Sequence, residues 1–143
     1  WGYDVEDNAY ALMKTDDEVI GMLNSSATQW RHRFNLDINL EHGSIILGGI
    51  ISGTKSYGAE TLTVVTADSD NDKGDPKEQI TRYNHDPSWY EEIKVFVDAI
   101  INKSELESST SNDALKTMEL VYKIYYADPI WRKKYDIQNP ERK

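Results

Sequence analysis

The strictest pattern in this 143-residue chain is the alternation of apolar and polar side chains from Trp30 to Leu40. Even positions carry Trp, His, Phe, Leu, Ile and Leu, and odd positions carry Arg, Arg, Asn, Asp and Asn. Because successive side chains of a strand point to opposite faces, this period of two predicts a β-strand over residues 30–40. One face of the strand is apolar and the other is charged, so the fold must cover the first and give the second a polar environment.

Five further segments have the composition of strands. They are residues 8–14, 18–26, 44–52, 60–67 and 78–84. The first two are separated only by Thr15-Asp16-Asp17, which predicts a hairpin. Gly43 is expected to turn the chain with a positive φ, and the pair Gly48-Gly49 indicates a bulge or a close approach of two backbones.

Helical spacing begins after residue 85. Asp86-Pro87 supplies a cap and a first-turn proline for a helix whose apolar positions run from Trp89 to Ile101. A second helix is expected to start at Thr110 or Ser111, with Asp113 in its first turn, and to end at Asp128-Pro129. The charged tail from Arg132 is expected to fray, apart from the rings of Trp131 and Tyr135, which can dock.

Strands first and helices last predict an α+β fold in one domain, residues 1–143. We expect a mostly antiparallel, open-faced sheet of five or six strands with two C-terminal helices on one face. The apolar side of the 30–40 strand would lie under the helices, and its charged side would lie on the open face.

The composition excludes several classes of function. A net charge of −9 repels nucleic acid and anionic lipid, so neither is an expected partner. The longest apolar run, Ile45–Ile51, is too short to span a bilayer, and no signal peptide is visible, which leaves the cytoplasm as the expected location. The chain has no cysteine and therefore no thiolate chemistry.

No metal or catalytic constellation is predicted. The loop Asp68, Asp70, Asp72 has the spacing that begins a calcium loop, but Lys73 occupies the position that requires glycine, so we expect a solvated acidic loop. The three histidines are far apart in sequence, and no nucleophile elbow is present.

Aromatic and arginine side chains gather at two places in the sequence. Trp30, Arg31 and Arg33 open the alternating strand, and Arg82, Tyr83, His85, Trp89 and Tyr90 lie where the last predicted strand leads into the first helix. Rings and guanidinium groups together suit a polyhydroxylated ligand, which offers CH faces to stack on and hydroxyls to bond. The alternative is an aromatic core beside a salt-bridged surface.

Four segments, spread over nearly the whole chain, resemble those of a known family. They are Val5-Glu6-Asp7-Asn8-Ala9 with the following Asp17 and Val19-Ile20-Gly21; Glu41-His42-Gly43-Ser44-Ile45; residues 89–100; and Ser111-Asn112-Asp113-Ala114-Leu115 through Tyr125. They are similar to the V-E-D-x-A and D-G-x-x-G, x-G-x-x-G-x-I, F-x-x-E-I-x-x-F-x-x-A-I and S-G-x-D-A-L patterns of the C-terminal domain of Gfo/Idh/MocA oxidoreductases. Glu18, Asn112 and Asp128 stand where that family has glycine, glycine and serine.

The resemblance implies an intact enzyme that transfers a hydride between NAD or NADP and a sugar or cyclitol. In the family, an N-terminal Rossmann domain binds the cofactor, and E-K-P and D-x-x-x-H motifs supply the proton-transfer groups. Neither motif occurs in this sequence. We therefore expect the Rossmann domain to be absent from this chain, which holds no cofactor and no catalytic residue and is inactive alone.

The same resemblance suggests two roles for the charged strand. The open sheet face commonly forms the subunit interface in the family, so Arg31, Arg33, Asp37 and Glu41 would pair across a two-fold axis of a homo-oligomer. Substrate-side contacts are expected from Trp30, Arg31, His32, Arg82, His85 and Trp89. In a regular strand Arg31 and His32 point to opposite faces, so both cannot contact one substrate.

A second function remains open from the sequence alone. The chain could instead be a stand-alone, non-enzymatic sugar-binding or scaffold domain, which would also lack the cofactor motifs. Binding of a sugar by the isolated chain with micromolar affinity would favour this alternative.

Overall fold

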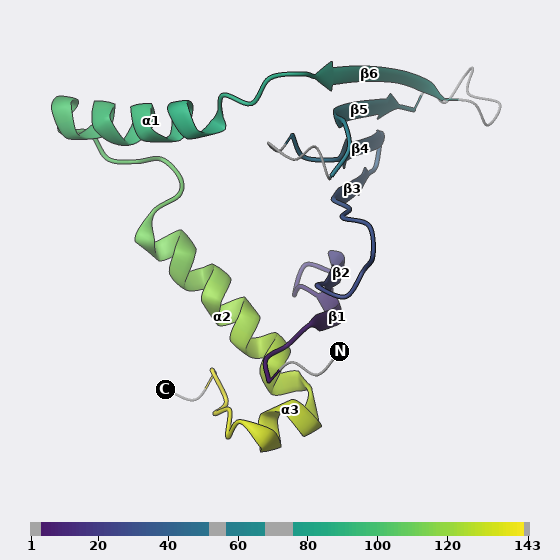
Figure 1. Ribbon diagram of the computed structural model, residues 1–143, viewed down its shortest axis with the longest axis vertical. Coiled ribbons are helices and arrows are strands. Elements are labelled where there is room, and N and C mark those ends of the chain that lie inside the picture. The colour runs from purple at the N-terminus through teal and green to yellow at the C-terminus, as the bar shows by residue number, and fades with distance from the viewer. Residues whose placement is uncertain (1–3, 52–56, 68–75, 142–143) are drawn as a thin grey trace. The chain divides into compact units, whose positions relative to one another are not determined.

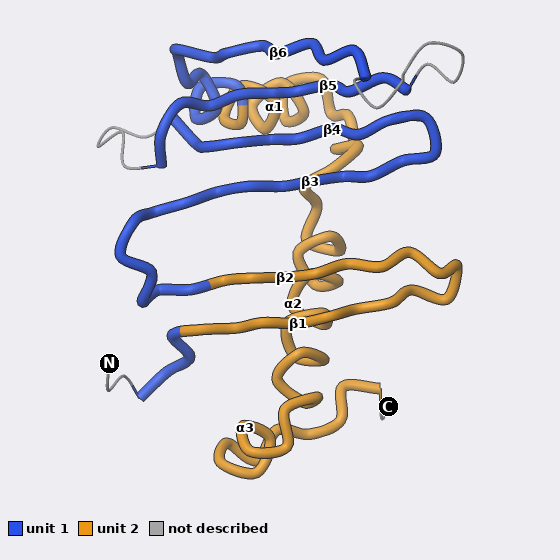
Figure 2. Tube along the Cα trace, turned by 90° about the vertical axis from the view of Figure 1, so that its right-hand side faces the viewer, with its two compact units in different colours: residues 1–7, 26–91 blue, residues 8–25, 92–143 orange. Residues whose placement is uncertain are grey.

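The computed structural model describes residues 4–51, 57–67 and 76–141. They form six strands followed by three helices in chain order (Figure 1). The chain divides into two compact units, residues 1–7 with 26–91 and residues 8–25 with 92–143, which Figure 2 colours separately. Each unit is described below by itself.

The first unit is built on a four-stranded antiparallel sheet. Its strands are β3 (Asn35–Leu40), β4 (Gly43–Gly48), β5 (Glu60–Thr66) and β6 (Lys77–Tyr83). They pair in chain order, β3-β4-β5-β6, so every connection joins neighbouring strands (Figure 1). Since β3 and β5 both run antiparallel to β4, they point the same way and begin at the same end of the sheet.

The register sorts the side chains of the sheet into an apolar face and a mostly polar one. Leu36 pairs with Leu47, which pairs with Leu62, and residues directly opposite each other share a face. On β3, β4 and β5 the apolar face is made by Leu36, Ile38, Leu40, Ile45, Leu47, Leu62 and Val64, whereas β6 contributes the polar Lys77, Gln79 and Thr81 to it. On β3 the other face carries Asn35, Asp37 and Asn39, so the alternation predicted from the sequence is confirmed for residues 35–40.

The predicted strand over residues 30–40 is nevertheless too long. Residues 30–34 lie outside β3, because β4, its neighbour in the sheet, ends at Gly48. The next residue, Gly49, has a φ of 73° and turns the chain away. Its N–H still donates to the Phe34 carbonyl oxygen, at 3.0 Å, but no ladder continues beyond that bond.

The glycines that bound β4 behave as the sequence indicated. Gly43 has a φ of 148°, and a Cβ added there would collide with the carbonyl oxygen of Val65. A Cβ at Gly49 would collide with the carbonyl oxygen of Ala59. Both ends of β4 therefore need a residue without a side chain, because β5 runs past them at close range.

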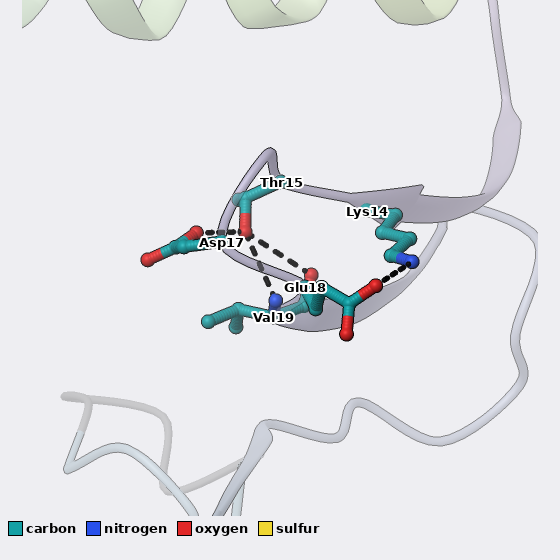
Figure 3. Close-up of polar contacts among 5 residues, drawn as sticks. All are labelled: Lys14, Thr15, Asp17, Glu18 and Val19. Carbon is teal, nitrogen blue, oxygen red and sulfur yellow. Dashed lines mark hydrogen bonds and ion pairs between the residues drawn. The ribbon is translucent and has the colours of Figure 1, made fainter.

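The second unit contains the predicted hairpin, formed by β1 (Asn8–Lys14) and β2 (Ile20–Ser26). Its turn is held by Thr15: the Val19 N–H donates to the Thr15 hydroxyl at 3.0 Å (Figure 3). The Glu18 N–H donates to the Thr15 carbonyl oxygen at 3.1 Å. The Thr15 hydroxyl donates to the Asp17 carboxylate. Glu18 takes the left-handed conformation, with a φ of 72°, and pairs with Lys14 at 2.9 Å.

The helices begin where the sequence predicted. At α1 (Ser88–Asn102), the Asp86 carboxylate accepts from the Ser88 N–H at 3.0 Å. At α2 (Ser111–Ala127), Thr110 and Asp113 form a capping box, in which each side chain accepts from the other residue's backbone N–H. The apolar stripe of α1 remains accessible, with Trp89 75% and Ile100 62% exposed.

A third helix, α3 (Pro129–Lys134), was not predicted. Asp128 both ends α2 and caps α3, and its carboxylate accepts from the N–H groups of Ile130 and Trp131. The Trp131 ring lies 6.3 Å from Tyr125 and 4.5 Å from Tyr135, between ring centroids. The expected docking of Trp131 and Tyr135 is confirmed. The prediction that the tail frays from Arg132 is wrong, because these rings anchor the tail.

The predicted α+β class with antiparallel strands is confirmed, but two details need correction. The strands form two sheets, of two and four strands, rather than one sheet of five or six. Three helices follow them instead of two. The Asp68–Asp72 loop lies outside the described residues. Among those residues, no helix has the length and apolarity that crossing a membrane requires.

Replacing Glu18 by glycine should stabilise the protein by about 0.5–1 kcal/mol. A left-handed conformation costs about 1–2 kcal/mol for a residue with a side chain and nothing comparable for glycine, while the lost exposed ion pair is worth less than about 0.5 kcal/mol. Chemical denaturation would measure the gain. Glu18→Ala removes the same ion pair but keeps Cβ, so an equal gain in that variant would contradict this explanation.

The capping box predicts an acid-sensitive contribution from Asp113. The Thr110 backbone N–H, and then its hydroxyl, hydrogen-bond the Asp113 carboxylate and lower its pKa below the usual 3.8. The stabilisation is therefore complete above the unfolded-state pKa and is lost as pH falls through the lower folded-state value. Thermal melts of Asp113→Ala should show a lower Tm than wild type at pH 7 and no difference at pH 2. Glu119→Ala, elsewhere on α2, is the control, and we do not expect a Tm difference from wild type that disappears between pH 7 and pH 2.

Candidate functional site

One hollow in the first unit combines cationic and aromatic side chains. It has a volume of about 530 Å³ and is lined by Gln29, Arg31, His32, Arg33, Phe34 and Tyr57. This volume lies within the range of about 300–1,000 Å³ that is usual for small-molecule sites. The hollow draws on two segments that are more than twenty residues apart in sequence, 29–34 and the residue Tyr57.

The sheet topology explains why these segments meet. Residues 29–34 lead into β3, and Tyr57 shortly precedes β5. Because β3 and β5 begin at the same end of the sheet, the chain segments before them converge there. The hollow therefore lies at one end of the four-stranded sheet.

Three contacts fix the backbone and rings around this end. The Gly49 N–H holds the Phe34 carbonyl oxygen at 3.0 Å, and the Ile51 N–H donates to the Glu60 carboxylate at 3.0 Å. The His32 ring meets the Tyr57 ring edge to face, with centroids 5.0 Å apart and an interplanar angle of 72°. This ring contact ties the two lining segments to each other.

The charge lining the hollow is positive. Arg31 and Arg33 line it and no carboxylate of the described residues does, although the chain as a whole carries −9. Neither arginine forms an ion pair with a carboxylate of the described residues, whereas Lys14, Lys94 and Lys123 pair with Glu18, Asp98 and Glu141. Within the described residues, the two guanidinium groups therefore have no carboxylate partner.

The structure brings together two of the six residues predicted to contact substrate. Arg31 and His32 both line the hollow. They were expected to point apart only in a regular strand, and that condition does not hold, because residues 30–34 lie outside β3. Trp30 is 98% exposed and does not line the hollow.

The other three predicted substrate contacts lie elsewhere in the first unit. Arg82 shares a row of the sheet with Thr61, Gly48 and Asn35, at the same end as the hollow. Because β6 is three strands away from β3, the backbone of Arg82 lies about 14 Å from that of Asn35. His85 follows β6 at this end, and Trp89 is in the first turn of α1.

The four predicted interface residues do not share one strand face. Arg31 and Arg33 line the hollow, Asp37 lies on β3, and Glu41 lies in the turn before β4. The common charged face required a strand from residue 30 onward, and β3 begins only at Asn35. Pairing of these residues with a second copy of the chain stays a prediction.

Sequence reasoning missed three residues of the hollow: Gln29, Phe34 and Tyr57. Phe34 was assigned to the apolar strand face, and Tyr57 had no pattern that linked it to residue 32. The signal that could have found Tyr57 is topological. In a meander, the segments before alternate strands meet at one end of the sheet.

No group of three or more potential metal ligands occurs within the described part of the chain. Comparisons of this chain with protein-family models, curated proteins and solved structures found no match. The chemistry assigned to the hollow therefore rests on its own residues.

Replacing Gly49 by alanine should destabilise the first unit by more than about 1 kcal/mol. The substitution forces a side chain into a left-handed conformation and also against the Ala59 carbonyl, which would pull the Phe34 anchor out of place. Gly58→Ala is the matched control, because Gly58 has a φ of 82° but nothing within 4 Å of an added Cβ. Urea denaturation of both variants measures the difference, and equal losses would mean that the close approach to β5 carries no energy.

Proposed function

We propose that this chain is the substrate-binding and subunit-contact domain of an NAD(P)-dependent oxidoreductase of the Gfo/Idh/MocA type, and that it binds a sugar or cyclitol in the hollow. The observation that carries the proposal is the hollow itself. Guanidinium and amide donors from Arg31, Arg33 and Gln29 line it together with the rings of Phe34 and Tyr57. Such a lining suits ring CH groups and hydroxyls on one ligand.

A second observation supports the family assignment. The family pattern D-G-x-x-G places a glycine where this chain has Glu18. The backbone at Glu18 is left-handed, with a φ of 72°, and this is the conformation for which glycine is normally used. A backbone that suits glycine at this position is what supports the proposed family assignment, although the residue here is glutamate.

The residues of this chain do not fit a nicotinamide dinucleotide. Such a cofactor needs a glycine-rich turn between a strand and a helix, where backbone N–H groups face the pyrophosphate. The strand-to-helix connection described here, from β6 to α1, has no glycine and places the Asp86 carboxylate on the helix N-terminus. An anion there repels phosphate, so we assign this chain no cofactor and no hydride-transfer step.

The role proposed for the chain is to bind and orient. The rings of Phe34 and Tyr57 would hold the apolar side of the polyol, and the edge-to-face contact with His32 fixes the position of Tyr57. Gln29 and the two arginines would donate hydrogen bonds to hydroxyl oxygens. Interactions of this kind place a reacting carbon without taking part in the chemistry.

Titration of the ¹⁵N-labelled chain with glucose or myo-inositol should shift amide signals of residues 29–34 and Tyr57, while NADH shifts none. Tyr57→Ala should weaken binding at least fivefold by removing the ring beside His32. Tyr10→Ala, on β1 and 69% exposed, is the control and should leave the affinity unchanged.

Three results would be decisive for this proposal. Polyol shifts outside the hollow, or none at all, would contradict the proposed site. Saturable NADH binding would contradict the absence of a cofactor site. Micromolar polyol affinity of the isolated chain would instead favour a stand-alone binding domain.

A further inference from the structure

We propose that the hollow selects a polyol that carries an oxyanion group, either a carboxylate or a phosphate, over the neutral sugar. This inference rests on the proposed function, because it specifies the class of polyol that the same hollow binds. It adds the charge of the ligand, which neither the alternating sequence pattern nor the family resemblance provides.

The first argument is electrostatic. Arg31 and Arg33 line one hollow, and its lining contains no carboxylate from the part of the chain that the structure describes. Two cations held close together repel each other, and an anion between them removes that repulsion. A neutral sugar would accept hydrogen bonds from the guanidinium groups but would leave both charges uncompensated.

The second argument is that neither Arg31 nor Arg33 pairs with a carboxylate of the described residues, as some other cations there do. Lys14, Lys94 and Lys123 each lie within 3.1 Å of a carboxylate oxygen. Arg132 stacks on Tyr126 at 4.7 Å and donates to its carbonyl oxygen. Arg31 and Arg33 have no such bond to a described residue, and a ligand oxyanion would supply one.

The third argument concerns geometry. A guanidinium group presents paired N–H donors that match the two oxygens of a carboxylate or phosphate. Arg31 and Arg33 are two residues apart on a segment outside the strand, and both reach the hollow. Tyr57, from the segment before β5, contributes an aromatic ring to the same hollow. The charged end and the sugar ring of one ligand would therefore have separate partners.

The test measures affinity of the complete chain by calorimetry, supported by amide shifts, at low and high salt. The probes are glucose, gluconate, glucose 6-phosphate, and inorganic phosphate and acetate without a sugar. We expect gluconate or glucose 6-phosphate to bind at least tenfold more tightly than glucose. The affinity for these anionic ligands should fall as the salt concentration rises. Comparing these two ligands identifies which oxyanion is preferred.

Two arginine variants localise the effect. Arg31→Ala and Arg33→Ala should each weaken binding of the anionic polyol at least tenfold and bring its affinity close to that of glucose. Lys77→Ala is the matched control, because Lys77 is an exposed cation of β6 at the opposite end of the same sheet. Circular dichroism verifies that each variant is folded.

The outcomes separate this inference from the function on which it rests. Equal binding of glucose and gluconate would overturn the inference and leave the polyol site intact. Inorganic phosphate binding as tightly as glucose 6-phosphate, with no glucose binding, would overturn both, because the sugar would contribute nothing.

The variants have decisive outcomes as well. A loss of binding in Lys77→Ala as large as that in Arg31→Ala would show a general charge effect and overturn the inference. A dimer in sedimentation that Arg33→Ala dissociates would assign these arginines to carboxylates of a second copy instead.

Discussion

The close passage of β5 beside both ends of β4 is the constraint on which the first unit depends. Gly43 and Gly49 mark these ends, and an added Cβ at either would collide with a carbonyl oxygen of the segment beside it, Val65 in β5 and Ala59 just before it. Between the glycines, β4 pairs with β3 on one side and with β5 on the other. The length of β4 therefore limits the length of β3, whose ladder stops where β4 turns away.

That limit creates the candidate site. Had β3 extended back to Trp30, Arg31 and His32 would have pointed to opposite faces, and no hollow could have used both. Released from the ladder, residues 29–34 instead converge with Tyr57. The Gly49–Phe34 hydrogen bond retains the released segment at its base. A glycine at the end of one strand thus determines the chemistry available at the end of its neighbour.

Charge in this protein is distributed unevenly. The chain carries −9 overall, and its described lysine pairs lie on helices and on the hairpin, where they form exposed ion pairs of small energetic value. The hollow, by contrast, is lined by two arginines and by no carboxylate among residues 4–51, 57–67 and 76–141. A local positive site within an acidic protein is the electrostatic basis of the proposed preference for an anionic ligand.

Local patterns in the sequence determined the secondary structure and most of the caps. Alternation identified the faces of β3, Thr110 and Asp113 identified the start of α2, and Gly43 identified a turn. Each depends on residues that are neighbours in the chain, for which propensity and spacing are sufficient. The α3 helix was missed because Asp128-Pro129 was interpreted only as a stop, although the same Asp128 caps the next helix.

Only the tertiary structure decided where the strands stop, how they divide into two sheets, and which side chains share the hollow. These features depend on pairing between segments far apart in the chain, which local spacing and propensity do not reveal. Arg31 and His32 were candidates from residue type alone, while Tyr57 entered the site because β3 and β5 begin at the same end of the sheet. The sequence thus supplied the chemistry of the candidate site, and the strand pairing decided which of its parts meet.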